Sequence, residues 1–191
     1  CCVADGSANP KWIAADLLSQ AEHDPRAAVF LITPDKDFGL AVQKEMEKQM
    51  KELSRYEIMK SSVDQYAKAF LCKDAEQCFD IVNKIAPEHL EVELPDPKKY
   101  LPLIYNAGAI FLGKYTSEPI GDYMAGPNHT LPTSGTAAFS SPLGVYDFVK
   151  HSSVECYSRE AFRKISKKVQ LFAKAEGLTA HAHAMEVRDE D

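Results

Sequence analysis

Short apolar runs alternate with longer amphipathic segments along most of the chain. The runs have the length of strands, and the β-branched residues of AAVFLIT suit a strand buried on both faces of a sheet. The predicted strands lie at 1–4, 27–33, 66–72 and 107–113. The predicted helices lie at about 10–23, 34–53 and 74–85. Strands that alternate with helices predict an α/β fold with a mainly parallel sheet and flanking helices.

The pattern changes after Pro142. The segment 145–158 is predicted to hold a short strand or two, and 159–177 has the pattern of a basic amphipathic helix that Gly177 ends. The apolar positions of this helix have the spacing of core or partner packing, and they are Phe162, Ile165, Val169 and Phe172. We therefore expect a domain at 1–143 and a helical C-terminal tail at 144–191.

Composition narrows the class of protein. The 191 residues carry a net charge of -6 without a basic block, so nucleic acid is not an expected partner. No apolar run has the length of a membrane span and no signal peptide opens the sequence, so we expect a cytoplasmic chain. The five cysteines form no CxxC pair and are expected to be reduced. Because the chain starts at Cys1 inside a strand-like run, we expect a piece of a longer protein.

The segment 118–135 combines several glycines and prolines with the acid and imidazole side chains of Glu118, Asp122 and His129. We expect it to follow an irregular path, because it shows no sustained helical or strand periodicity. A loop of this length usually lines a functional site or is disordered, and the apolar runs on both sides argue against disorder. The segment therefore predicts a functional loop.

Two further pairs could carry chemistry. Gln20 and His23 lie three residues apart on a predicted helix, so they could share one metal ion, although an isolated pair of this kind more often faces water. Glu88 and His89 are adjacent at the start of an extended run, where they would point to opposite sides. That arrangement suits two separate proton-transfer roles, and a charged surface turn is an equal alternative.

A wider set of oxygen and nitrogen donors is available for a metal ion. It contains Gln20, His23, Asp122 and His181 and no sulfur, which suits zinc or a similar divalent ion. Spacing alone does not show that these residues meet. The chain has neither a GxGxxG nor a GxxxxGK[ST] motif, and it has no GxSxG motif, so phosphate-cradling loops and serine-hydrolase chemistry have little support.

Four long motifs resemble the histidinol dehydrogenase family in their order and spacing. They are DLLSQAEH at 16–23, IAPEHLE at 85–91, the segment 108–145, and EGLTAHAHA at 176–184. The resemblance covers nearly the whole chain. It implies a Rossmann-like domain and the last step of histidine biosynthesis, in which L-histidinol is oxidised through histidinaldehyde to L-histidine with two NAD+.

The resemblance also implies roles for particular residues. One zinc ion per site would be held by Gln20, His23, Asp122 and His181. Glu88 would be the base that activates water, and His89 the acid and base that takes the alcohol proton. The substrate-binding positions would be His89, Glu118, Asp122, His129, Glu176 and His181.

The resemblance covers only the C-terminal part of the family's chain. The half that contributes most NAD contacts is absent, so the NAD-contacting residues are not identified. The family's C-terminal tail crosses to a second subunit, which implies a homodimer in which Glu176 and His181 complete the partner's site. One alternative is an inactive zinc-binding dimerisation fragment, and a zinc hydrolase with Glu88 as base ranks last. A plastid location is expected if the source is a plant.

Overall fold

The computed structural model describes residues 1–190 and contains one sheet of five parallel strands in the order β3-β2-β1-β4-β5. The strands are β1 (Cys2–Ala4), β2 (Phe30–Thr33), β3 (Lys68–Leu71), β4 (His89–Glu93) and β5 (Ala109–Leu112). The chain moves outward from β1 to β3, returns to β4 beside β1, and ends the sheet at β5. This arrangement confirms the expected α/β class with a Rossmann-like parallel sheet.

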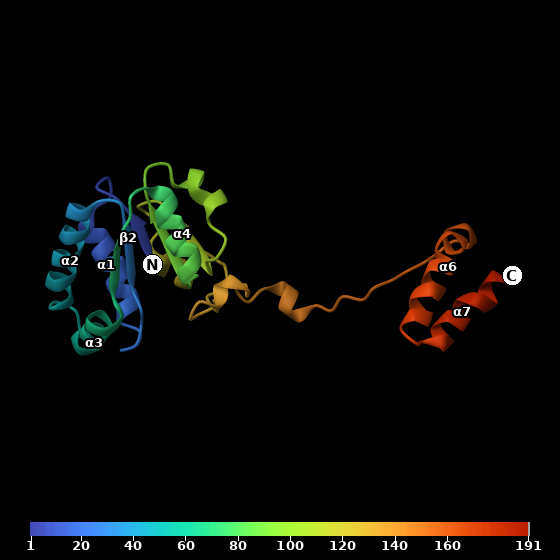
Figure 1. Cartoon of the computed structure of the whole chain (residues 1–191). Helices are drawn as coiled ribbons and strands as arrows, with labels where there is room; N and C mark the ends of the chain where they lie inside the picture. Colours follow the sequence, from blue (N-terminus) through green and yellow to red (C-terminus); the bar gives the residue numbers. More distant parts are fainter. Residues whose placement is uncertain (191) are drawn as a thin grey trace. The chain divides into compact units, whose positions relative to one another are not determined.

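Helices cover both faces of the sheet, and Figure 1 shows α1 and α2 on one side of β2 and α4 on the other. The helices of this unit are α1 (Pro10–Ala21), α2 (Lys36–Met50), α3 (Tyr56–Tyr66) and α4 (Ala75–Ile85), with the 3-10 helix η1 (Pro97–Leu103) beside α4. The first face buries Ile13, Leu18 and Met59 in one core. The second face buries Phe79 and Val82 in another. The sheet is therefore the middle layer of three.

The helix starts follow from local capping. The Asn9 side chain accepts a hydrogen bond from the Lys11 amide at 3.0 Å, and Pro10 occupies the first helical position of α1. Asp35 caps α2 and Asp74 caps α4 in the same way. At the end of α4, Ala86 adopts a left-handed conformation with φ 49, which turns the chain toward β4.

The side chains of β4 alternate between the two faces of the sheet. Leu90 and Val92 enter the core beneath α4. His89, Glu91 and Glu93 therefore face the side that α1 covers, and all three are buried. A strand in the middle of the sheet thus carries a row of ionisable side chains into the interior.

Three expectations about secondary structure need correction. The segment 118–135 is not irregular throughout, because Glu118–Tyr123 forms the short helix α5. The helix α3 was not predicted. In the described residues of 145–158 there is no strand, and only the 3-10 helix η3 (Val145–Phe148) forms, since most of these side chains are exposed and have no sheet to join.

The chain divides into two compact units, Cys1–Phe148 and Val149–Asp191. In the second unit, α6 (Arg159–Ala175) packs on α7 (Thr179–Asp189). Ser166 and Gln170 of α6 are buried and hydrogen-bond to Asp189 at 3.0 and 2.7 Å. Phe172 stays 70% exposed, so the apolar face predicted for this helix is not fully covered within the unit. No helix among residues 1–190 is long and apolar enough to cross a membrane.

Candidate functional site

His89 stands at the centre of a polar cluster between β4, α1 and α5. Its Nδ1 atom lies 2.9 Å from the Gln20 side-chain oxygen. Its Nε2 atom lies 3.6 Å from a Glu118 carboxylate oxygen and 4.0 Å from an Asp122 carboxylate oxygen. Ring and carboxylate atoms of His89, Glu118 and Asp122 all lie within 4.8 Å of one another, so this cluster could hold a cation.

Regular helical spacing brings these side chains to one place. Glu118 and Asp122 lie four residues apart on α5 and therefore project from the same side of that helix. Gln20 lies in the last turn of α1, next to Ser19, whose hydroxyl oxygen is 3.4 Å from Glu118 Oε2. The helices α1 and α5 thus flank the start of β4, where His89 enters the interior.

Burial keeps the imidazole of His89 neutral. Removal from water lowers the pKa of His89 to about 4, and the nearby charge of Asp122 offsets only part of this effect. If the proton is on Nδ1, that atom donates to the Gln20 oxygen and Nε2 keeps a free lone pair. Nε2 is buried and has no hydrogen-bond partner among the described residues. The site therefore contains a proton acceptor without a bound proton.

The two glutamates beside His89 hold their protons more tightly than usual. Burial, with a hydrogen bond to Asp122 and its charge, raises the pKa of Glu118 to about 7. Burial and the charge of Asp122 also raise the pKa of Glu88, whereas the charge of His23 lowers it. The Glu118 carboxyl is thus suited to proton transfer near neutral pH, and the pKa of Glu88 moves in the same direction.

The backbone of Glu88 is fixed by the start of β5. The Ala109 amide donates a hydrogen bond to the Glu88 carbonyl at 2.8 Å, and the Gly108 amide donates one to the Pro87 carbonyl at 2.9 Å. A Cβ atom on Gly108 would lie 2.6 Å from the Glu88 carbonyl oxygen, so only glycine allows this close approach. The sheet therefore holds the Glu88–His89 pair rigidly.

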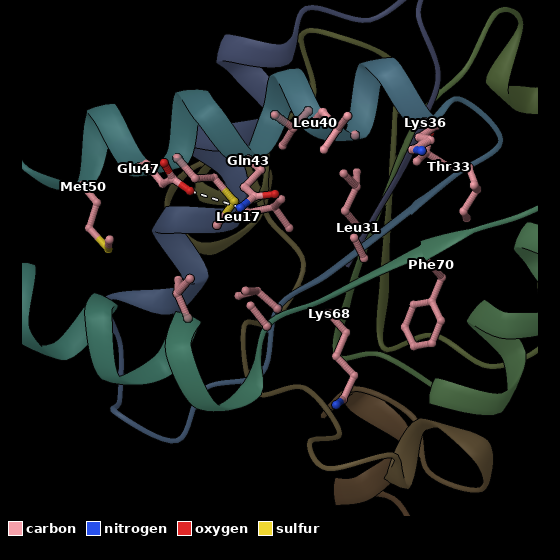
Figure 2. Close-up of a pocket in the computed structure, with 18 of the residues that line it drawn as sticks. Leu17, Leu31, Thr33, Lys36, Leu40, Gln43, Glu47, Met50, Lys68 and Phe70 are labelled. Atoms are coloured by element: carbon pink, nitrogen blue, oxygen red, sulfur yellow. Dashed lines mark hydrogen bonds between the residues drawn. The ribbon is translucent and has the colours of Figure 1, made fainter.

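A cavity of about 600 Å³ opens beside this cluster. Gln20, Glu88 and His89 line one part of it, and Ser134 with Gly135 lines another. Its size suits a small polar molecule, and its lining includes the titratable side chains of Glu88 and His89 as well as the basic side chains of Arg26 and Lys84. A second cavity of about 490 Å³ lies between α2, α3, β2 and β3 (Figure 2). That cavity is mainly apolar, is lined by residues such as Leu31, Leu40 and Phe70, and contains none of the predicted site residues.

The structure brings together most of the predicted site residues of the first unit. Gln20, His89, Glu118 and Asp122 meet directly, and Glu88 lies within the range of the Asp122 charge. His23 follows the end of α1, is exposed, and is close enough to affect the pKa of Glu88 and His89.

Three predicted residues lie elsewhere. His129 is exposed in the segment after α5. Glu176 is the C-terminal cap of α6, and His181 lies on α7. Both belong to the second unit, where both are exposed. The structure therefore does not test the part of the site that they were predicted to form.

The sequence did not lead us to predict a second cluster of acidic side chains next to the His89 cluster. Carboxylate atoms of Asp16, Glu91 and Glu93 lie within 4.8 Å of one another. Part of the signal was present: Asp16 is four residues before Gln20 on the same helix, and Glu91 is two residues after His89 on the same strand face. The packing of α1 over β4, which neither spacing predicts, brings the two acids together.

Similar proteins were found by sequence and by structure. A family model described as histidinol dehydrogenase matches residues 1–189. The histidinol dehydrogenases of Aquifex aeolicus and Listeria monocytogenes are 52% and 53% identical over 189 residues, which is 99% of this chain and 44% of each relative. The crystal structure of histidinol dehydrogenase from Elizabethkingia anophelis matches with a TM-score of 0.92 and 35% identity, over 99% of this chain and 43% of that one. The chain thus spans less than half the length of these relatives.

Proposed function

Because the chain belongs to the histidinol dehydrogenase family, we propose that it carries the zinc and substrate site of an enzyme that oxidises L-histidinol through histidinaldehyde to L-histidine, with NAD+ as hydride acceptor. The relatives named histidinol dehydrogenase support an oxidoreductase of histidine biosynthesis. The single observation that carries the proposal is the buried His89, placed between Gln20 of α1 and Asp122 of α5 beside a polar cavity.

The donor atoms of the first unit fit zinc. Gln20, His23 and Asp122 offer oxygen and nitrogen without sulfur, and His181 would be the fourth ligand. The Gln20 amide oxygen has two lone pairs, so it can accept a hydrogen bond from His89 and still face a metal ion. Zinc bound there would hold the substrate's imidazole and amine in place.

The chain's own residues would move the protons. Nε2 of His89, which has no hydrogen-bond partner among the described residues, would accept the proton of the substrate hydroxyl as the first NAD+ takes the hydride. The Glu88 carboxylate would accept a proton from the water that adds to the aldehyde, before a second NAD+ takes the second hydride. Glu118, His129 and Glu176 would contact the substrate, and a carboxylate oxygen of the buried Glu118 lies 3.6 Å from His89 Nε2.

The second unit supports a shared site. His181 is exposed on α7, and Phe172 and Leu171 of α6 are each 70% exposed. Large apolar side chains in this state often mark an interface. We infer a homodimer in which the tail of one copy brings Glu176 and His181 to the site of the other.

One other function has a specific observation in its favour. The chain covers 44% of its relatives, so it could be a zinc-binding dimerisation module that is inactive without the rest of the family's sequence. NADH formation from L-histidinol distinguishes the two. The chain is assayed with zinc and NAD+, alone and together with the N-terminal portion of the Aquifex aeolicus relative.

The proposal predicts turnover when the two portions are combined, and Asp122→Ala should abolish it. Zinc binding without turnover under both conditions would favour the inactive module. Failure to bind zinc would contradict both functions.

A further inference from the structure

We propose that Glu91, paired with Asp16, is a positioning residue that holds the start of α5 and thereby sets Glu118 and Asp122 against His89. This inference rests on the proposed function, because it assigns Asp122 to the zinc site. It adds residues that touch neither substrate nor metal.

The contacts of Glu91 lead directly to α5. Glu91 is only 3% exposed, and its Oε1 atom accepts a hydrogen bond from the Glu118 backbone amide at 3.3 Å. Ser117, the N-cap of α5, makes no side-chain capping hydrogen bond. One of the unpaired amides that begin any helix is therefore satisfied from β4 instead. Glu91 therefore caps α5 although it lies 27 residues before Glu118 in the sequence.

Asp16 connects the same point to α1. Its carboxylate lies within 4.8 Å of the carboxylates of Glu91 and Glu93. Burial raises the pKa of Asp16, and the neighbouring Glu91 and Ser117 offset part of this effect. The start of α5 thus lies against the buried Glu91, which bonds the Glu118 amide, and the half-buried Asp16.

A shared proton would explain how the buried Glu91 and the half-buried Asp16 can be adjacent. Glu91 Oε2 has no partner among the described residues if both groups are ionised. Burial, followed by the charge of Asp16, raises the pKa of Glu91 to about 9. Protonated Glu91 can donate to Asp16 from one oxygen and accept from Glu118 with the other. Both of its hydrogen bonds are then satisfied.

Loss of the hydrogen bond from Glu118 to Glu91 would displace Asp122. The helix α5 has only six residues, so its hydrogen bonds cannot hold it in place without outside contacts. Asp122 lies one turn after Glu118 and on the same side. A shift at the start of the helix therefore moves Asp122 relative to Gln20 and His89.

Three variants test the role in the 191-residue chain. Glu91→Ala removes both hydrogen bonds, whereas Glu91→Gln keeps a donor for Asp16 and an acceptor for Glu118. Glu93→Gln is the matched control, because Glu93 belongs to the same buried cluster and Glu93 Oε2 has no hydrogen-bond partner among the described residues. Amide hydrogen exchange of residues 116–124 measures the hold on α5 without any metal. Cobalt(II) affinity, from its visible absorption, measures the metal site.

Glu91→Ala should speed exchange in 116–124 by about fivefold or more, the effect of losing a buried hydrogen bond. It should weaken cobalt binding by roughly 10 to 100-fold, as loss of a supporting contact does. Glu91→Gln should restore both, and Glu93→Gln should change neither. If Glu91→Ala does not fold, Glu91→Leu carries the same expectation.

Unchanged exchange in Glu91→Ala, or equal damage from Glu91→Gln, would overturn the proposal. So would magnesium or calcium binding that Glu93→Gln abolishes, since the cluster would then be a cation site. If the unmodified chain binds no cobalt, the proposed zinc site fails, whereas the exchange data still test Glu91.

Discussion

At the residue scale, the proposed chemistry depends on how burial and neighbouring charges shift the pKa values of His89, Glu88 and Glu118. In water the imidazole of His89 would be partly protonated near neutral pH. Burial lowers the pKa of His89, so the ring is neutral and Nε2 can accept a proton. Burial has the opposite effect on Glu88 and Glu118, whose protonated forms become easier to populate. One desolvated cluster thus contains a neutral imidazole that can accept a proton and two carboxyls whose pKa values are raised, that of Glu118 to about 7.

Glu88→Gln should slow the oxidation of histidinaldehyde more than that of L-histidinol. The amide cannot take a proton from water, whereas His89 remains to accept the alcohol proton. We expect a loss of roughly 10²-fold or more in the second step, the usual contribution of a general base. Rapid-mixing measurement of NADH in the chain combined with the rest of the enzyme, started from either substrate, separates the two steps.

The exposed Glu57→Gln serves as the control for a lost carboxylate. Equal slowing of both oxidations by Glu88→Gln would contradict the separate roles of Glu88 and His89.

Some of the site at this scale could be predicted from the sequence. Motif spacing singled out Gln20, Glu88, His89 and Asp122, and the structure brings them to one place. The pairing of Asp16 with Glu91 could not be predicted with them. It depends on which helix lies over β4, and that is a property of the tertiary fold rather than of either motif.

At the element scale, α5 connects the sheet to the site. A Cβ atom on Gly121 would lie 2.7 Å from Phe111 Cε1, so this glycine lets α5 lie directly on the ring of a β5 side chain. The Phe111 ring is buried and also packs near His89, with centroids 6.1 Å apart. The ring therefore cannot move away without disturbing the site.

Gly121→Ala should push α5 away from β5 and separate Asp122 from His89. Overpacking of this kind costs about 1–3 kcal/mol, more than the helix gains from alanine. We expect a lower melting temperature and weaker zinc binding in a chelator competition. Gly39→Ala is the matched control, because that helical glycine has ordinary contact distances of 3.5 Å and beyond. A Gly121→Ala protein with unchanged zinc affinity would show that α5 does not position Asp122.

Helices and strands could be predicted where one hydrophobic pattern, an apolar run or an amphipathic repeat, continued through the whole segment. The apolar runs that became β1, β2, β3 and β5 were identified, and three amphipathic segments became α1, α2 and α4. The helix α5 was missed because it has only six residues and contains Gly121, so the sequence shows no sustained helical pattern there. It forms because its first residue is tied to β4 and its glycine packs on β5. Tertiary contacts thus outweigh local propensity there.

At the scale of the whole molecule, the proposed site needs both units. Gln20, His23 and Asp122 come from Cys1–Phe148, and His181 comes from Val149–Asp191. Mixing Asp122→Ala chains with His181→Ala chains tests whether the tail is exchanged between copies. In a mixed dimer with exchanged tails, one of the two sites regains every ligand, so random mixing should restore tight zinc binding at about one site in four. Each variant alone should bind weakly, and a mixture that binds no better than its parts would rule out the exchanged tail.

The central claim is that this chain holds L-histidinol through zinc. Calorimetric titration of the zinc-loaded 191-residue chain with L-histidinol tests it most directly, with chelator-stripped chain and Asp122→Ala as controls. The account predicts one L-histidinol bound per chain when zinc is present, and much weaker binding in both controls. Binding that is equally tight without zinc, or no binding by the zinc-loaded chain, would contradict it.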